Sequence, residues 1–82
     1  MPFCVYVLRN KHDGKHYVGS TEDIQVRLKQ HNQGKCRYTK GHRPWMIVYQ
    51  EGFATRTEAI KRENFFKSGV GRKILKELLA SR

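Results

Sequence analysis

Two short runs of β-branched and aromatic residues near the start of the chain constrain its fold more than any other feature. They cover residues 3–9 and 16–20, and the segment between them contains the turn-forming pair Asp13-Gly14. This pattern predicts an antiparallel β-hairpin. Because a hairpin has apolar side chains to bury, the rest of the chain must supply elements that cover it.

A first helix is predicted directly after the hairpin, over about residues 21–33. Ser20 or Thr21 is its expected N-cap, and the two acidic residues that follow are expected in the first turn, where the helix dipole favours negative charge. Gly34 marks the end of this helix.

A third strand and a second helix follow. Residues 45–50 have strand composition, and Trp45 and Tyr49 are expected to share one face of that strand as core or partner-facing residues. The segment T-R-T-E at 55–58 is typical of a capping box, so a helix is predicted from there to about residue 68, with Gly69 as its C′ residue.

An apolar stripe at helical spacing predicts the last helix. The stripe consists of Ile74, Leu75, Leu78 and Leu79. The predicted order is therefore β-β-α-β-α-α. We expect a single α/β domain over residues 1–82, with a small three-stranded antiparallel sheet flanked by helices.

Composition narrows the class of partner. The 82 residues carry 17 Lys and Arg against 7 Asp and Glu, a formal net charge of +10, which points to a polyanion. Nucleic acid is the simplest candidate, and an anionic membrane surface is the competing one. No apolar run is long enough to cross a bilayer, so a cytoplasmic protein is expected. Cys4 and Cys36 lack metal-ligand spacing and are expected to be free thiols, with no disulfide-linked partner.

The predicted hairpin contains two tyrosines, one on each strand. If its turn is centred near residues 11 and 12, Tyr6 lies opposite Tyr17, and if it is centred one residue later, Tyr6 lies opposite Gly19 with Tyr17 as a diagonal neighbour. Either register places both tyrosines on one face, as core residues or as a functional pair. Gly19 permits either close approach by a neighbour or a tight entry into the following helix.

Three charged or titratable residues on the predicted helices suggest chemistry. Arg27 and His31 stand at i and i+4 on one side of the first helix, either as an anion site or as a solvated basic face. Glu63 shares a stripe of the second helix with apolar residues. A buried carboxylate needs a partner, so Glu63 either pairs with Arg27 or Arg62 or holds a metal ion such as Mg²⁺.

The joint pattern resembles the GIY-YIG nuclease domain, in particular its small single-domain bacterial members. The resemblance rests on Cys4-Val5-Tyr6, on Tyr17-Val18-Gly19 eleven residues after the first tyrosine, and on Arg27, His31 and Glu63 in that order. It covers essentially the whole chain and implies a small antiparallel sheet flanked by helices. It also implies cleavage of DNA phosphodiesters with one divalent metal ion.

The resemblance implies a role for each matched residue. Tyr6 and Tyr17 become the two motif tyrosines, one of which positions or deprotonates the attacking water, and Gly19 is the motif glycine. Arg27 would bind the scissile phosphate and stabilise transition-state charge. The remaining two roles are a proton relay or phosphate contact for His31 and a ligand to Mg²⁺ or Mn²⁺ for Glu63.

Two departures from the family pattern stand out. Cys4 occupies the position of the first motif glycine, and residues 72–78 contain no asparagine where many family nucleases carry one in the last helix. The second departure bears on activity rather than on fold. We therefore keep two functions in view: a DNA endonuclease acting in repair or recombination, and a nucleic-acid-binding module of the same fold with little or no cleavage.

Basic residues outside the motifs predict a binding surface for DNA or RNA. The segment that follows the first helix is either a phosphate-tracking loop or a solvated one, and further positive charge follows near the last helix. The candidates are Lys35, Arg37, Tyr38, Lys40, His42, Arg43, Lys67, Arg72 and Lys73. The sequence does not indicate the oligomeric state.

Overall fold

The computed structural model describes residues 2–35 and 44–80. Its elements are β1 (Phe3–Asn10), β2 (His16–Thr21), α1 (Ile24–Asn32), β3 (Trp45–Phe53), α3 (Arg56–Lys67) and α4 (Gly69–Ala80). This order confirms the predicted β-β-α-β-α-α arrangement. Within the described ranges, no helix has the length and apolar character that spanning a membrane requires.

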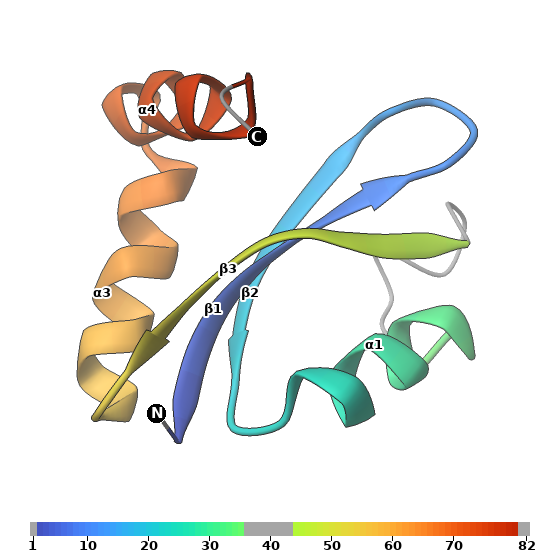
Figure 1. Ribbon diagram of the computed structural model, residues 1–82, viewed down its shortest axis with the longest axis horizontal. Coiled ribbons are helices and arrows are strands. Elements are labelled where there is room, and N and C mark those ends of the chain that lie inside the picture. The colour runs from blue at the N-terminus through green and yellow to red at the C-terminus, as the bar shows by residue number, and fades with distance from the viewer. Residues whose placement is uncertain (1, 36–43, 81–82) are drawn as a thin grey trace.

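The three strands form one antiparallel sheet in the order β2-β1-β3, with β1 in the centre. The hairpin loop turns at Gly14, whose φ of +73° is a conformation that favours glycine. Asn10 stabilises the loop because its Oδ1 accepts hydrogen bonds from the backbone N–H groups of His12 and Asp13. Figure 1 shows α1 on one side of this sheet and α3 with α4 on the other.

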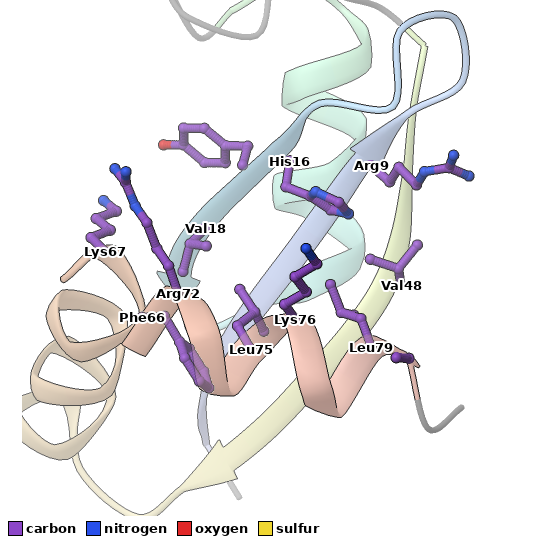
Figure 2. A pocket seen from close by; sticks show the side chains of 12 residues that line it. Arg9, His16, Val18, Val48, Phe66, Lys67, Arg72, Leu75, Lys76 and Leu79 are labelled. Atoms are coloured by element: carbon purple, nitrogen blue, oxygen red, sulfur yellow. The ribbon is translucent and has the colours of Figure 1, made fainter. Parts of the chain in front are cut away.

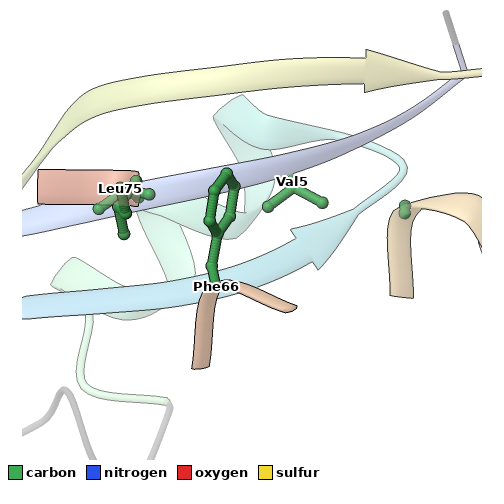
Figure 3. Close-up of a cluster of buried hydrophobic side chains, with 5 residues drawn as sticks. Val5, Phe66 and Leu75 are labelled. Carbon is green, nitrogen blue, oxygen red and sulfur yellow. The ribbon is translucent and has the colours of Figure 1, made fainter. Parts of the chain in front are cut away.

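The sheet face beneath α3 and α4 carries an aliphatic core. Val5 and Val7 of β1 point to this face and pack with Ala59, Phe66 and Leu75 from the two helices. Figure 3 shows the ring of Phe66 between Val5 and Leu75. All five residues are buried, so this cluster supplies much of the hydrophobic stabilisation of a small domain.

The face beneath α1 carries an aromatic core with polar groups in it. Tyr6 and Leu8 alternate with the two valines along β1 and pack with Trp45 of β3. Half-buried Ile24 and Leu28 of α1 cover this cluster. The central strand therefore serves two cores of different chemistry, one on each face.

Helix α1 is shorter at its start than the sequence predicted. The expectation of Ser20 or Thr21 as N-cap is wrong, because Asp23 caps the helix by accepting from the backbone N–H groups of Gln25 and Val26. The acidic residues therefore stand before the first turn rather than in it. The predicted end is confirmed, since Gly34 follows the last turn with a φ of +81°.

The junction of α3 and α4 corrects another prediction. Thr55 is the N-cap of α3 and accepts from the backbone N–H of Glu58, as the capping-box pattern predicted. Gly69 follows the C-cap Ser68 as predicted, but it begins α4 at once and does not adopt the positive φ of a glycine that terminates a helix. Gly71 makes the corner possible, since a Cβ there would lie 1.6 Å from the carbonyl oxygen of Phe65.

Strand β3 contains an irregularity that the sequence did not predict. Its pairing with β1 shifts by one residue between Val7 and Leu8, so Tyr49 pairs with Val7 while Trp45 pairs with Asn10. The expectation that Trp45 and Tyr49 share a face is therefore wrong. Trp45 belongs to the core under α1, and Tyr49 packs against the core under α3 and α4.

Candidate active site

The two motif tyrosines lie side by side on the α1 face of the hairpin. Tyr6 pairs with Gly19 across the strands and Tyr17 pairs with Leu8, which selects the second of the two predicted registers. The ring centroids of Tyr6 and Tyr17 are 6.4 Å apart. Tyr6 is 1% exposed, whereas Tyr17 is half-buried, so Tyr17 is the phenol that solvent and a ligand can reach.

His31 joins the tyrosines from the last turn of α1. Its Nε2 and the Tyr6 hydroxyl oxygen are hydrogen-bonded at 2.9 Å, and the edge of the Tyr17 ring lies against it at a centroid distance of 4.9 Å. The side chain is fully buried, and this burial, with the charge of Arg27, lowers the pKa of His31 to about 4. A neutral, buried imidazole fits a proton relay better than a phosphate contact.

Gly19 is needed because Tyr6 lies directly over it. A Cβ on residue 19 would stand 2.5 Å from the Tyr6 hydroxyl oxygen and 2.7 Å from Cζ of the same ring. The backbone of Gly19 is ordinary, since among the described residues only Gly14 and Gly34 have positive φ. Of the two predicted uses of this glycine, the structure supports close approach by a neighbour rather than a tight turn.

Arg27 stands one helical turn before His31 at the edge of this cluster. It is half-buried, and its Nη1 donates a hydrogen bond to Oε1 of Gln30 at 3.0 Å. The expectation that Arg27 and His31 together form a solvated basic face is not met, because His31 is in the core. The guanidinium lies close enough to His31 for its charge to help lower the pKa of that imidazole.

Glu63 approaches the same strand from the opposite face of the sheet. Its Oε1 accepts a hydrogen bond from the hydroxyl of Ser20 at 2.6 Å, and its Oε2 accepts from Nζ of Lys67 at 2.7 Å. The predicted pairing with Arg27 or Arg62 is wrong. Arg62 pairs instead with Glu51 of β3 at 2.8 Å, because it points to a different side of α3.

Ser20 is the site residue that the sequence analysis missed. It follows Gly19 on β2 and pairs with Val5, so its side chain lies on the α3 face while Gly19 lies on the α1 face. Glu63 is 43 positions away along the chain, and no local pattern links the two residues. Strand β2 thus carries the tyrosine cluster on one face and the hydrogen-bonded carboxylate on the other.

The carboxylate of Glu63 fits a hard divalent cation. Within residues 2–35 and 44–80 no three His, Cys, Asp or Glu side chains gather as a metal site, so a protein-enclosed ion such as structural zinc does not fit. Mg²⁺ is commonly held by one or two carboxylates while keeping several waters for a phosphate. Glu63, with 18% of its side chain exposed, offers one such oxygen ligand at the edge of β2.

The predicted nucleic-acid contacts fall into three groups. Arg37, Tyr38, Lys40, His42 and Arg43 lie outside the described residues, as does Cys36. Lys35 is exposed just after α1, and Lys73 is exposed on α4. Lys67 and Arg72 line a groove between α4 and the sheet, to which Tyr17 also contributes (Figure 2).

Comparison with known proteins identifies the family. The model of the GIY-YIG catalytic domain matches residues 2–75. The chain belongs to the GIY-YIG family. Its relatives include a UPF0213 protein of Staphylococcus saprophyticus, 44% identical over 73 residues, and one of Staphylococcus aureus, 40% identical over the same length; each match covers 88% of both chains. These are small single-domain bacterial members of the family.

A solved structure of a GIY-YIG relative has the same fold. It is the solution structure of UPF0213 protein BH0048 from Bacillus halodurans, with a TM-score of 0.57 and 36% identity. The match covers 95% of this chain and 85% of that one. Membership places the chain in a nuclease family with a nucleic-acid substrate, and the names of these relatives specify no activity.

Proposed function

We propose that this GIY-YIG protein is a cytoplasmic, divalent-metal-dependent endonuclease that hydrolyses phosphodiester bonds of DNA, in repair or recombination. One observation carries the proposal. Strand β2 brings the Tyr6–Tyr17–His31 cluster and Glu63 to adjacent positions, because Gly19 supports the cluster and the next residue, Ser20, hydrogen-bonds the carboxylate. A base, an anion-binding guanidinium and a carboxylate are the groups that phosphodiester hydrolysis needs.

The burial of the tyrosines supports different roles for them. Tyr17 is half-buried and is therefore the candidate to position or deprotonate the attacking water. Tyr6 is buried and hydrogen-bonded to His31, so it is placed to orient the cluster and to pass a proton between the active site and the imidazole. With the pKa of His31 near 4, the ring is neutral at pH 7 and can accept that proton only transiently.

Arg27 is the proposed phosphate ligand. A guanidinium forms two parallel hydrogen bonds to a phosphate and stabilises the charge that develops on its oxygens during in-line attack. The side chain is only half-buried and lies one turn from His31, which suits a group that binds substrate at the rim of a closed cluster.

Glu63 is the proposed ligand of Mg²⁺ or Mn²⁺. When bound, such an ion supplies Lewis-acid stabilisation of the phosphate and of the leaving oxygen. Ser20 holds one carboxylate oxygen of Glu63 toward β2, and Lys67 neutralises the other. Binding an ion at the second oxygen requires the Lys67 ammonium to move away, and its exposed position on α3 permits that movement.

The substrate surface is proposed to use the basic residues around this centre. Lys35, Lys73 and the basic residues of 36–43 are phosphate contacts in this proposal, and Lys67 and Arg72 are further candidates. The net charge of +10 supports a polyanionic substrate, and contacts of this kind position a nucleic acid without reading its bases.

A binding module without cleavage is the second candidate. The observation that favours it is the composition of α4, which contains no asparagine within residues 72–78. In this alternative the fold and the basic surface are used for binding alone. Glu63 then serves only as the hydrogen-bond partner of Ser20 and Lys67.

Cleavage of a labelled substrate panel tests the two candidates. The panel contains single-stranded, duplex, flapped and branched DNA and RNA, each with Mg²⁺, Mn²⁺ or EDTA. We expect wild-type cleavage that EDTA abolishes and that Glu63→Gln or Tyr17→Phe reduces by at least about 100-fold. The matched controls are Glu77→Gln and Tyr49→Phe, which make the same atomic changes outside the proposed site.

The alternative predicts a different outcome. If the wild-type protein binds the panel but cuts no faster than Glu63→Gln, the chain is a binding module. If Tyr49→Phe reduces cleavage as much as Tyr17→Phe, the tyrosine assignment is wrong. Binding of Glu63→Gln to DNA without metal should equal or exceed that of the wild type, because a negative charge near the phosphates has been removed.

A further inference from the structure

An open groove of about 1200 Å³ runs between α4 and the sheet on the aliphatic face, and Tyr17 of the tyrosine cluster also lines it. Its floor is almost entirely apolar and comes from β2, β3, α3 and α4. The floor residues are Val18, Val48, Phe66, Leu75 and Leu79. Figure 2 shows the side chains of Leu75 and Leu79 directed from α4 toward the strands. A groove of this volume with an apolar floor is large enough to receive part of a ligand.

The rim of the same groove is positively charged. Arg9, Lys67, Arg72 and Lys76 border it, and no acidic side chain lines it within the described residues. Lys67 pairs with Glu63, whereas Arg9, Arg72 and Lys76 form no ion pair with another described residue. The rim therefore presents at least three cations that no described carboxylate neutralises.

The charge of the rim and the apolar character of the floor together limit the class of ligand that the groove can bind. A second copy of the chain is a poor occupant, since each copy carries a net charge of +10. Single-stranded nucleic acid binds in such grooves by pairing its phosphates with cations and stacking its bases on exposed aromatic rings. The aromatic residues that line this groove are Tyr17, at one end, and Phe66, which is 1% exposed. An aliphatic floor instead suits the leucine, isoleucine or methionine side chains of a polypeptide.

We infer that this groove docks an acidic amphipathic segment of a partner protein. Its apolar side chains occupy the floor, and its carboxylates pair with Arg9 and Lys76 on the rim. This is a helix-in-groove mode of recognition with electrostatic complementarity at the edge. The inference goes beyond the proposed nuclease activity, because it needs neither metal nor nucleic acid.

Lys67 connects the groove with the candidate active site. It lines the groove and donates a hydrogen bond to Glu63. A partner carboxylate at that end of the groove competes with Glu63 for the ammonium group. Docking is therefore expected to change the environment of the one carboxylate proposed to hold the metal ion.

Synthetic peptides test the inference directly. The probe is an amphipathic peptide of about four helical turns, with leucine on one stripe and glutamate on the flanks. One control peptide replaces the leucines by serine and keeps the charge, and the other replaces the glutamates by glutamine and keeps the leucines. Fluorescence anisotropy with the full chain, without metal or nucleic acid, measures binding, and ¹⁵N chemical-shift mapping locates it.

Matched variants separate the groove from general charge attraction. Lys76→Gln removes a rim charge, and Lys73→Gln makes the same change on the same helix outside the groove. Leu79→Ser changes the floor, and Ile74→Ser is its more exposed control. We expect Lys76→Gln and Leu79→Ser each to weaken peptide binding about tenfold and the controls less than about twofold. Both control peptides should bind at least about tenfold more weakly than the probe.

Several results would overturn the inference. The probe peptide could fail to bind, shift resonances outside the groove, or bind no better than the serine peptide of equal charge. Equal weakening by Lys76→Gln and Lys73→Gln would show that charge alone drives binding. If a DNA oligonucleotide shifts the groove resonances, and Lys76→Gln and Leu79→Ser weaken its binding as much as that of the peptide, the groove belongs to the nucleic-acid surface instead.

Discussion

The two faces of the sheet differ in what their cores contain. The face under α3 and α4 is packed with aliphatic side chains and Phe66, and its packing needs no buried polar group. The face under α1 buries two polar side chains, His31 and Asn10, beside Tyr6 and Trp45. Burying a polar group costs free energy, most of all where a donor such as Nδ2 of Asn10 has no hydrogen-bond partner among the described residues, so this second core sacrifices stability that an apolar core would provide.

In this chain of 82 residues, one face of the sheet mainly stabilises the fold and the other carries the tyrosine and histidine side chains of the candidate site. Strand β1 alternates Val5 and Val7 with Tyr6 and Leu8, so one strand serves an apolar core and a polar cluster at once. Substitutions on the first face should therefore change stability first, and those on the second face should change pH dependence and catalysis. The following predictions test that division.

The largest effect is expected for Phe66→Ala on the aliphatic face. Phe66 is 1% exposed and packs between Val5 and Leu75, so its removal leaves a cavity and should lower the free energy of unfolding by about 3–5 kcal/mol. Urea denaturation measures this loss. Ile60→Ala on the same helix, at a site 42% exposed, should change the free energy by at most about 1 kcal/mol. Equal losses for both variants would contradict the assignment of this core.

A pH-dependent loss of stability is expected from the aromatic face. The pKa of His31 is about 4 in the folded chain, against an ordinary value of 6.5, so between these values the unfolded chain binds more protons. The contribution of neutral His31 to the free energy of unfolding should be fully present above about pH 6.5. It should be lost as the pH is lowered toward 4, which reduces the free energy of unfolding by up to about 3 kcal/mol.

Urea midpoints measured from neutral to mildly acidic pH check this slope. His31→Gln should flatten it, although that variant is less stable overall because Tyr6 loses a partner. His16→Gln is the control on the other face, where the pKa is also lowered but the side chain is exposed and its contribution to the slope is small. If the wild type and His31→Gln lose stability equally as the pH is lowered, His31 does not cause the pH dependence.

Local chemistry made the hairpin and the start of α3 predictable. Asp13-Gly14 supplies the one turn conformation that joins the strands, and Thr55 with Glu58 satisfies the first N–H groups of the helix. The pairing register was not predictable to one residue, because both registers kept Tyr6 and Tyr17 on one face. The shift in the register of β3 was also not predictable from the sequence, because no glycine or proline marks it between Trp45 and Tyr49.

The candidate site was predictable in its residue types and not in its contacts. A carboxylate beside apolar residues of α3 required a partner, and that reasoning was sound. Which partner it found depended on the tertiary approach of α3 to β2, and this approach selects Ser20 and Lys67 over Arg27 and Arg62. Helical spacing predicts the Lys67 contact at i+4, whereas only the fold predicts Ser20.

The smallest effect on stability, and the sharpest test of the division between the faces, is expected for Ser20→Ala. Ser20 points to the aliphatic face and hydrogen-bonds Glu63 there, directly after the glycine that supports the tyrosine cluster, so it should behave as a positioning residue. We expect a change in the free energy of unfolding of at most about 1 kcal/mol and a roughly tenfold loss of Mn²⁺ affinity, measured by electron paramagnetic resonance.

Ser20→Thr distinguishes positioning from packing, because it keeps the hydroxyl and adds a methyl group. Its Mn²⁺ affinity should return to within about threefold of the wild type, since the hydrogen bond from the hydroxyl to Glu63, rather than the volume of the side chain, orients the carboxylate. If Ser20→Ala binds Mn²⁺ as well as the wild type, the hydroxyl does not orient the carboxylate. If instead Ser20→Ala lowers the free energy of unfolding as much as Phe66→Ala does, Ser20 belongs to the stabilising core. The proposed separation of a stabilising face from a catalytic face would then be wrong.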